Sequence, residues 1–165
     1  MKQDLAALRQ QFVEAAGHAT QTFGFGRIIG QIYAHAYFTP QPLSLDDLAR
    51  DLGISKGSAS MAVRQLETWG ALRKLWVKGD RKDYYEPTEE FGKIIRKALV
   101  DLVGQSMESA DSLISQTEAQ LQQLPSSESV DAEIAFFRKR VAKIDWFRKR
   151  AQGLWESPVI RMLFK

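Results

Sequence analysis

The sequence contains no cysteine and only two histidines, and these absences remove several classes of function. Without cysteine there is no disulfide, no thiolate nucleophile and no cysteine redox sensor. The histidines, His18 and His35, have no acidic cluster at ligand spacing, so neither a zinc site nor a serine–histidine–aspartate triad is expected. We therefore predict a protein that is not an enzyme and that has no metal or cofactor.

Long apolar runs are also missing. No run approaches the roughly 20 residues that a membrane span needs. The amino-terminal Met-Lys-Gln-Asp-Leu lacks the apolar core of a signal peptide. With 165 residues, the chain suits one domain or a small domain with helical extensions. These features predict a cytoplasmic protein with no membrane partner.

Positive charge is concentrated in one segment of the chain. The net charge is only +3, yet residues 50–82 contain eight lysines or arginines against three acids, a balance of +5. The segments 1–49 and 83–165 each carry −1. A local cationic excess of this kind is typical of a surface that contacts phosphates.

The same segment has the pattern of two helices joined by a turn. Ser44 is a suitable N-cap with Asp47 at the N3 position, so a short helix is expected from Leu45. Gly53 suits the turn, and Ser55 can cap a second helix, residues 56–69. A helix of this size that follows a tight turn is typical of a helix that enters the major groove of DNA.

A basic ribbon follows this second helix. Residues 72–78 alternate as in a strand, Gly79 begins a turn, and residues 83–86 return as a second strand. Asp80 is expected to orient Arg81 by a charge-assisted hydrogen bond. The order helix, turn, helix and ribbon is that of a winged helix-turn-helix.

The second helix divides into an apolar face and a polar face. Ala59, Val63 and Leu66 fall at i, i+4 and i+7, which indicates a core stripe. Arg64 suits a guanine edge and Met61 a thymine methyl group, while Gly57 permits close approach to the backbone of DNA. On the wing, an arginine can reach the minor groove and lysines can neutralise phosphates. The predicted DNA-contacting residues are Lys56, Gly57, Ser58, Ser60, Met61, Arg64, Lys78, Arg81 and Lys82.

Helices are expected on both sides of this core. Apolar spacing predicts helices over residues 3–22 and 27–38, a long helix that starts at Pro87–Glu90, and a final helix from about Val130 to Leu154 after a break at Pro125–Ser127. The predicted fold is mainly α, in the order α-α-α-α-β-β-α-α. We assign residues 1–43 to amino-terminal helices for dimerisation or an effector pocket, 44–87 to the DNA-binding core, and 88–165 to long helices for dimerisation.

Three features outside the core allow two interpretations each. Residues 24–30 begin like a dinucleotide motif, but Ile29 stands at the third glycine position and no strand precedes them; Gly26, Gly30 and Ala34 suit close packing of two helices better. The basic runs 138–140 and 148–150 suit a second DNA-contacting face or a solvated face. Aromatic residues near the first two helices suit a packed core or a ligand cage; these candidates are Phe23, Phe25, Tyr33 and Tyr37.

The chain resembles the MarR-like winged-helix transcriptional regulators, and within them the branch related to the glycine-betaine synthesis repressor (GbsR). The resemblance is carried by residues 54–61, 66–70 and 77–85, and extends weakly through 26–30 and to Phe91. The general MarR pattern has Asp-x-Arg in the wing and Leu-Thr after it, whereas this chain has Asp-Arg-Lys at 80–82 and Pro-Thr at 87–88. The resemblance implies a homodimer on a pseudo-palindromic operator, usually a repressor that a small molecule releases.

We therefore predict a homodimeric transcriptional repressor that binds double-stranded DNA through helix 56–69 and wing 78–83. A choline-like effector is one possible ligand. The alternative is a winged-helix module that binds a protein partner and has no operator of its own. The small, basic face of helix 56–69 favours DNA, because a protein interface would be richer in aromatic residues.

Overall fold

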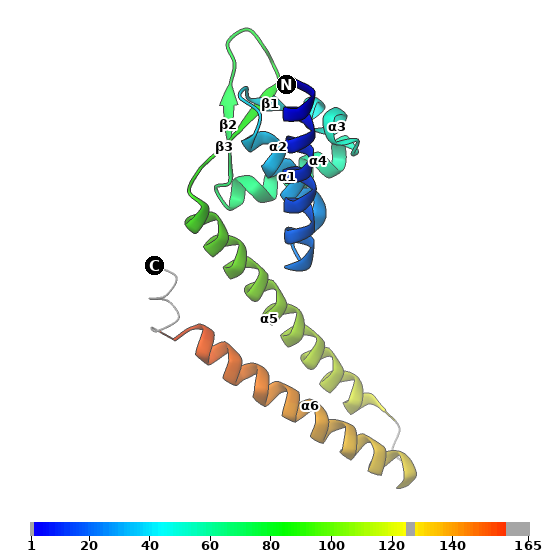
Figure 1. The fold of residues 1–165 in the computed structure, drawn as a ribbon. Helices are drawn as coiled ribbons and strands as arrows, with labels where there is room; N and C mark the ends of the chain where they lie inside the picture. Colours follow the sequence, from blue (N-terminus) through cyan, green and yellow to red (C-terminus); the bar gives the residue numbers. More distant parts are fainter. Residues whose placement is uncertain (1, 125–127, 158–165) are drawn as a thin grey trace. The chain divides into compact units, whose positions relative to one another are not determined.

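The computed structural model describes residues 2–124 and 128–157, in two compact units, 1–99 and 100–165. The predicted break at 125–127 and the end of the chain, 158–165, lie outside the described residues. The helices are α1 (Lys2–Thr22), α2 (Arg27–Tyr37), α3 (Leu45–Leu52), α4 (Lys56–Thr68), α5 (Phe91–Gln123) and α6 (Glu128–Trp155) (Figure 1). The strands are β1 (Leu43–Ser44), β2 (Leu72–Trp76) and β3 (Asp83–Pro87). Within the described ranges, no helix is both long and apolar enough to cross a membrane.

The predicted mainly helical winged fold is confirmed, with one addition. The sheet has three antiparallel strands in the order β1-β3-β2, not two. β1 pairs Leu43 with Tyr85 and Ser44 with Tyr84, directly before α3 begins. Two residues are too few to show alternation in a sequence. This strand forms because β3 offers a free edge beside them.

The core of the first unit lies between α2, α3, α4 and the sheet. Ile32, Leu48 and Val63 are the largest side chains in it with almost no exposure, and Trp69 and Tyr85 close it at the sheet side. The predicted stripe on α4 is confirmed, since Ala59, Val63 and Leu66 are all buried. α4 is therefore anchored by one face, and its opposite face is free for another role.

α1 and α2 pack at backbone distance around Gly30. A Cβ atom at Gly30 would lie 2.1 Å from the carbonyl oxygen of Ala16, so only glycine fits this contact. The predicted role of Gly26 in packing is wrong, because a Cβ there would meet nothing within 4 Å. Gly26 instead has φ +90° at the N-cap of α2, a conformation that favours glycine.

The start of α5 differs from the prediction. Residues 87–90 were expected to begin the helix, but Pro87 is the last residue of β3 and the helix starts at Phe91. Thr88 is held extended by tertiary hydrogen bonds: its N–H donates to the carbonyl of Ala71 (2.9 Å), and its carbonyl accepts from the Tyr33 hydroxyl (2.7 Å). These bonds outweigh the local preference for a helix start, which nearby residues alone could not reveal.

In the second unit, the basic runs of α6 are not one uniform face. Arg148 is only 11% exposed and pairs with Asp111 on α5 (2.9 Å) and with Asp145. Arg140 and Arg150 lie over aromatic rings of α6 itself, Phe136 and Trp146. Because Arg148 is turned inward, the run 148–150 cannot present all its charges to DNA.

Candidate nucleic-acid interface

α4 is positioned by caps that the sequence predicted. The Ser55 hydroxyl accepts a hydrogen bond from the Ser58 N–H (3.0 Å) and caps the helix. α3 ends at Gly53 in the left-handed conformation, φ +65°. α3 itself begins with the predicted capping box, in which the Ser44 hydroxyl accepts from the Asp47 N–H and the Asp47 carboxylate accepts from the Ser44 N–H. The turn between the helices is thus defined at both ends.

The free face of α4 is formed by Gly57, Met61 and Arg64. These residues are exposed and recur at helical spacing, opposite the buried stripe. Met61 is 76% exposed, which is unusual for a large apolar side chain and fits contact with a partner surface. Lys56 is exposed at the first turn of the helix, where free N–H groups favour an anion.

Two predicted contact residues are less available than expected. Ser58 and Ser60 are only half-exposed. The Ser58 hydroxyl accepts a hydrogen bond from the Ser55 hydroxyl (2.8 Å), and Ser58 lines a shallow groove between α4 and the start of α2. Ser58 therefore contributes to the cap of the helix as well as to its surface.

The wing carries three exposed cations, Lys78, Arg81 and Lys82. Its ribbon is braced by an ion pair between Arg73 and Glu86, which face each other across the strands, and by Lys74 and Asp83 (2.7 Å). Within the described part of the chain, the side chains of Arg64, Lys78 and Arg81 form no ion pair. These three cations are available to an external anion.

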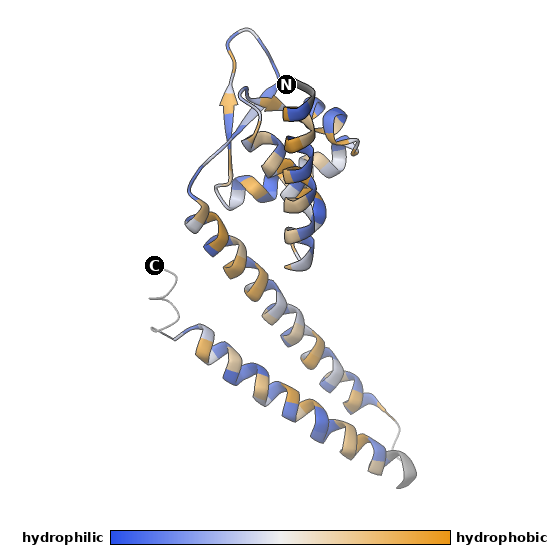
Figure 2. Cartoon of the chain, in the orientation of Figure 1, coloured by the Kyte–Doolittle hydropathy of each residue, from blue (hydrophilic) through white to orange (hydrophobic). Residues whose placement is uncertain are grey.

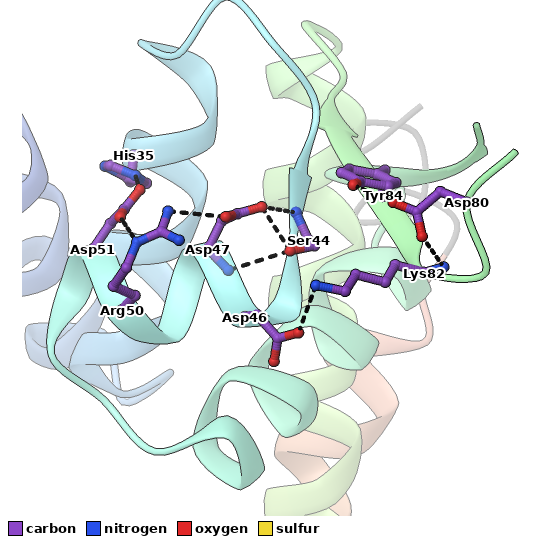
Figure 3. Close-up of polar contacts among 9 residues, drawn as sticks. All are labelled: His35, Ser44, Asp46, Asp47, Arg50, Asp51, Asp80, Lys82 and Tyr84. Atoms are coloured by element: carbon purple, nitrogen blue, oxygen red, sulfur yellow. Dashed lines mark hydrogen bonds and ion pairs between the residues drawn. The ribbon is translucent and has the colours of Figure 1, made fainter. Parts of the chain in front are cut away.

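The predicted contact between Asp80 and Arg81 is wrong. The Asp80 carboxylate accepts hydrogen bonds from the Lys82 N–H (3.0 Å) and from the Tyr84 hydroxyl (2.8 Å), so it closes the turn (Figure 3). These bonds lower the pKa of Asp80, the Lys82 N–H having the largest effect. A short turn favours such local bonds over a long, exposed arginine side chain.

Sequence reasoning missed Asp46, which lies between the helix and the wing. Its carboxylate contacts Lys56 Nζ (2.7 Å) and Lys82 Nζ (3.2 Å). Figure 3 shows this carboxylate beside the wing lysine, and Asp47 turned to Ser44 and Arg50. An acid in the first turn of a helix is expected for the helix dipole alone. The residues around Asp46 do not indicate that its partners lie 10 and 36 residues later in the chain, so these two contacts can be found only in the folded protein.

Trp76 is a second residue that the sequence did not mark. It is the last residue of β2 and is 78% exposed. Strand alternation predicted one face for Leu72, Lys74 and Trp76, but only Leu72 is buried, because the ribbon extends beyond the core. An exposed tryptophan beside the wing cations could stack on a sugar or base, or on a protein partner.

The aromatic candidates lie around an apolar cavity in the first unit. The cavity measures about 460 Å³ and is lined by Phe23, Phe25 and Tyr33 together with Trp69 and Phe91. Tyr37 does not line it but packs against Tyr33 (6.0 Å between ring centroids) and Phe91 (5.5 Å). Burial, followed by nearby Tyr37 and Glu89, raises the pKa of Tyr33 to about 12. The site is thus a set of rings without a charged group in its lining.

The side chain of His35 has a structural contact. His35 Nε2 lies 3.2 Å from Asp51 Oδ2, which joins α2 to the end of α3 (Figure 3). In residues 2–124 and 128–157, no group of three or more histidine and acidic side chains could hold a metal ion.

Comparison with known proteins agrees with this geometry. Residues 39–75 match the IclR helix-turn-helix domain. The chain is 20% identical over 163 residues to the HTH-type transcriptional repressor GbsR of Bacillus subtilis (strain 168), covering 94% of this chain and 90% of GbsR. It is 27% identical over 82 residues to the repressor OpcR of the same organism, 50% of this chain. The match covers 44% of OpcR and 45% of the regulator YvaV, so it spans a little under half the length of these two relatives.

Solved structures share the fold. A crystal structure described as a transcriptional regulator superposes with a TM-score of 0.52 at 21% identity, covering 89% of this chain and 97% of that one. The related proteins are named as regulators and not as enzymes, in agreement with the prediction. The chain thus has a winged-helix fold, contains a segment that matches the IclR helix-turn-helix domain, and is similar to the repressor GbsR over most of its length.

Proposed function

We propose that the chain is a homodimeric transcriptional repressor, in the cytoplasm, that binds a pseudo-palindromic operator through helix 56–69 and wing 78–83. The observation that carries this proposal is the free face of α4. Gly57, Met61 and Arg64 are exposed there, opposite a fully buried face, in the same unit as the unpaired wing cations Lys78 and Arg81. A groove-binding helix needs this division between a packed face and a reading face.

Arg64 and Lys78 have different roles in this proposal. An arginine on the reading face contacts a base edge, which depends on sequence, whereas a wing lysine contacts phosphates, which do not. Replacing Arg64 by alanine should therefore cost about 1–3 kcal/mol on the preferred sequence and relax the preference. Replacing Lys78 by alanine should weaken all duplexes equally and reduce the salt slope by about 1.

Fluorescence anisotropy tests both changes. The probes are a duplex selected from a random pool by the unmodified protein and the same duplex with its base pairs shuffled. We expect log K to fall steeply with log salt for the unmodified protein. A binding constant that does not change with salt would contradict DNA binding. Recovery of a stoichiometric protein partner, with no duplex retained, would favour the alternative of a protein-interaction module.

The aromatic cavity is the proposed effector site. Its five rings surround apolar space: Phe23 and Phe25 lie between α1 and α2, Tyr33 in α2, Trp69 directly after α4 and Phe91 at the start of α5. Leu66 of α4 also lines the cavity, so an occupant would contact the helix that carries the reading face. The faces of aromatic rings attract a quaternary ammonium group by cation–π contact, and the carboxylate of Glu89 lies near Tyr33. The proposal is that a choline-like cation binds here and releases the operator.

Calorimetry with two matched ligands tests the effector. Choline and its neutral isostere 3,3-dimethylbutanol have nearly the same shape, so only the cation gains from the rings. We expect choline to bind more tightly and Phe25→Leu to remove the difference. Equal binding of the two ligands would contradict a cation cage, and no binding of either would remove the cavity from the proposal.

A further inference from the structure

The Asp46 carboxylate forms ion pairs with Lys56 and Lys82, two of the lysines predicted to contact DNA phosphates. One carboxylate oxygen lies 2.7 Å from Lys56 Nζ, and the other lies 3.2 Å from Lys82 Nζ. Lys56 is the first residue of α4 and Lys82 lies in the wing, so a single acid joins the two elements proposed to contact DNA. Figure 3 shows the contact of Asp46 with Lys82. In this state each ammonium group is paired with a carboxylate oxygen, which partly neutralises its charge.

All three side chains are open to an incoming phosphate. Asp46 is 43% exposed, Lys56 64% and Lys82 56%. Hydrogen bonds from Lys56 and then Lys82 lower the pKa of Asp46, so its carboxylate is ionised at neutral pH, where both lysines are charged. A phosphate that approaches either lysine therefore competes with the anionic oxygens of the Asp46 carboxylate for the same ammonium group.

The fold does not require Asp46 for its own stability. The capping box of α3 uses Ser44 and Asp47, and Asp47 also pairs with Arg50 (2.9 Å). The wing turn is closed independently, by the hydrogen bonds that Asp80 accepts from the Lys82 N–H and the Tyr84 hydroxyl. Exposed ion pairs add little to stability. Removal of the Asp46 charge should thus release both ammonium groups without unfolding either element.

We propose that Asp46 is an internal competitor for DNA phosphates, which must displace it from Lys56 and Lys82 before either lysine can bind the duplex. The proposal rests on the DNA-binding function proposed above. Because the two lysines contact phosphates, the competition lowers the affinity for every duplex, whatever its sequence. The competition therefore limits weak binding to non-operator DNA, and the protein stays bound only where the α4 face makes base contacts.

Asp46→Asn tests the proposal, since it removes the charge and preserves the shape. In anisotropy titrations of the full chain with the shuffled duplex, we expect about three- to tenfold tighter binding at low salt, from release of exposed ion pairs. Asp46→Glu keeps the charge and should bind as the unmodified protein does. Asp83→Asn, which frees Lys74 outside the predicted contact set, measures the general effect of removing one negative charge.

A double-mutant cycle separates competition from remote repulsion. In a chain with Lys56→Ala and Lys82→Ala, there is no ammonium group for Asp46→Asn to release, so its gain should disappear. A gain that persists in that background, or Asp46→Asn binding no tighter than Asp83→Asn, would overturn the proposal. Weaker binding by Asp46→Asn, with an unchanged melting curve, would also overturn it and would make Asp46 a residue that positions the lysines. If the unmodified chain binds no duplex at all, the proposed function itself fails, and that result is distinct from each of these.

Discussion

Gly30 determines how closely α1 approaches α2. The Thr20 hydroxyl accepts a hydrogen bond from the Gly30 N–H (3.2 Å), and an added Cβ would lie within 2.6 Å of that hydroxyl and 2.1 Å of the Ala16 carbonyl oxygen. Neither atom can yield easily, because Ala16 is helix backbone. The packing of the amino-terminal helices is therefore controlled by the absence of one methyl group.

Gly30→Ala should destabilise the first unit. Overpacking of this kind costs about 1–3 kcal/mol, and denaturant unfolding followed by circular dichroism would measure it. Gly92→Ala is the matched control, since a Cβ at Gly92 would meet nothing within 4 Å. It should leave stability unchanged or raise it by up to about 1 kcal/mol. Equal effects of the two substitutions would contradict the close contact.

Tyr33 makes stability depend on alkaline pH. Its pKa is raised from 10.0 to about 12, chiefly by burial, so the folded state holds the phenolic proton more tightly than the unfolded state. This contribution is complete below pH 10 and is lost as the pH rises from about 10 to 12, with a size on the order of 2 kcal/mol. Tyr33→Phe lacks the hydroxyl that donates to the Thr88 carbonyl, and should be less stable than the unmodified protein at pH 9 by about 1 kcal/mol.

Unfolding curves at several pH values check this linkage. The difference in unfolding free energy between the unmodified protein and Tyr33→Phe should shrink between pH 10 and pH 12. Lysines that titrate in the same range affect both proteins alike, so the difference isolates Tyr33. A constant difference across that range would mean that the phenol is not protected from ionisation.

At the scale of elements, α4 depends on its cap. Ser55 is exposed and accepts from the Ser58 N–H, so its replacement by alanine leaves a donor at the helix start without a side-chain partner. Ser55→Ala should lower the unfolding free energy by about 1 kcal/mol. Ser55→Asn supplies another good capping oxygen and should restore most of it. If asparagine does no better than alanine, the cap is not what holds this end of α4.

The wing is an element held mainly by polar contacts. Beyond the buried Tyr85 the strands leave the core, and the ion pair of Lys74 with Asp83 and the Asp80 turn hold this part of the ribbon. Such pairs contribute roughly 0.2–1 kcal/mol each. The wing can therefore adjust to a bound surface at small energetic cost, while α4, anchored by a buried face, cannot.

At the scale of the molecule, many large apolar side chains remain exposed. Leu5, Leu8 and Phe12 on α1 are at least half exposed, and α6 exposes Ile144 and Phe147. Figure 2 shows hydrophobic residues along the lengths of α5 and α6. Exposed apolar surface of this extent is typical of an interface. The proposed homodimer would cover it.

Ile144→Glu should weaken self-association. Ile144 is 62% exposed, and a buried, unpaired carboxylate at a subunit contact is strongly unfavourable. Sedimentation equilibrium should show a dimer for the unmodified protein and at least a tenfold larger dissociation constant, roughly 1.4 kcal/mol, for the variant. Lys143→Glu, at the neighbouring exposed position, should have a much smaller effect. An unchanged dimer in Ile144→Glu would exclude this face of α6 from the interface.

The sequence by itself determined the helix-turn-helix and which face of its second helix is buried. Ser44, Gly53 and Ser55 act through bonds and backbone angles within a few residues, and the stripe of Ala59, Val63 and Leu66 needs only helical spacing to indicate the buried face. These signals are local, so they can be read without the fold. The exposed face of α4 followed directly from them.

Only the tertiary structure decided the contacts between distant residues. β1 exists because β3 lies beside it, Thr88 stays extended because Ala71 and Tyr33 bind it, and Asp46 meets lysines from two other elements. Each depends on a partner far away in the chain, and side-chain identity alone does not select that partner. The acid that pairs with Lys56 and Lys82, two lysines proposed to contact DNA phosphates, is therefore visible in the folded protein and not in the sequence.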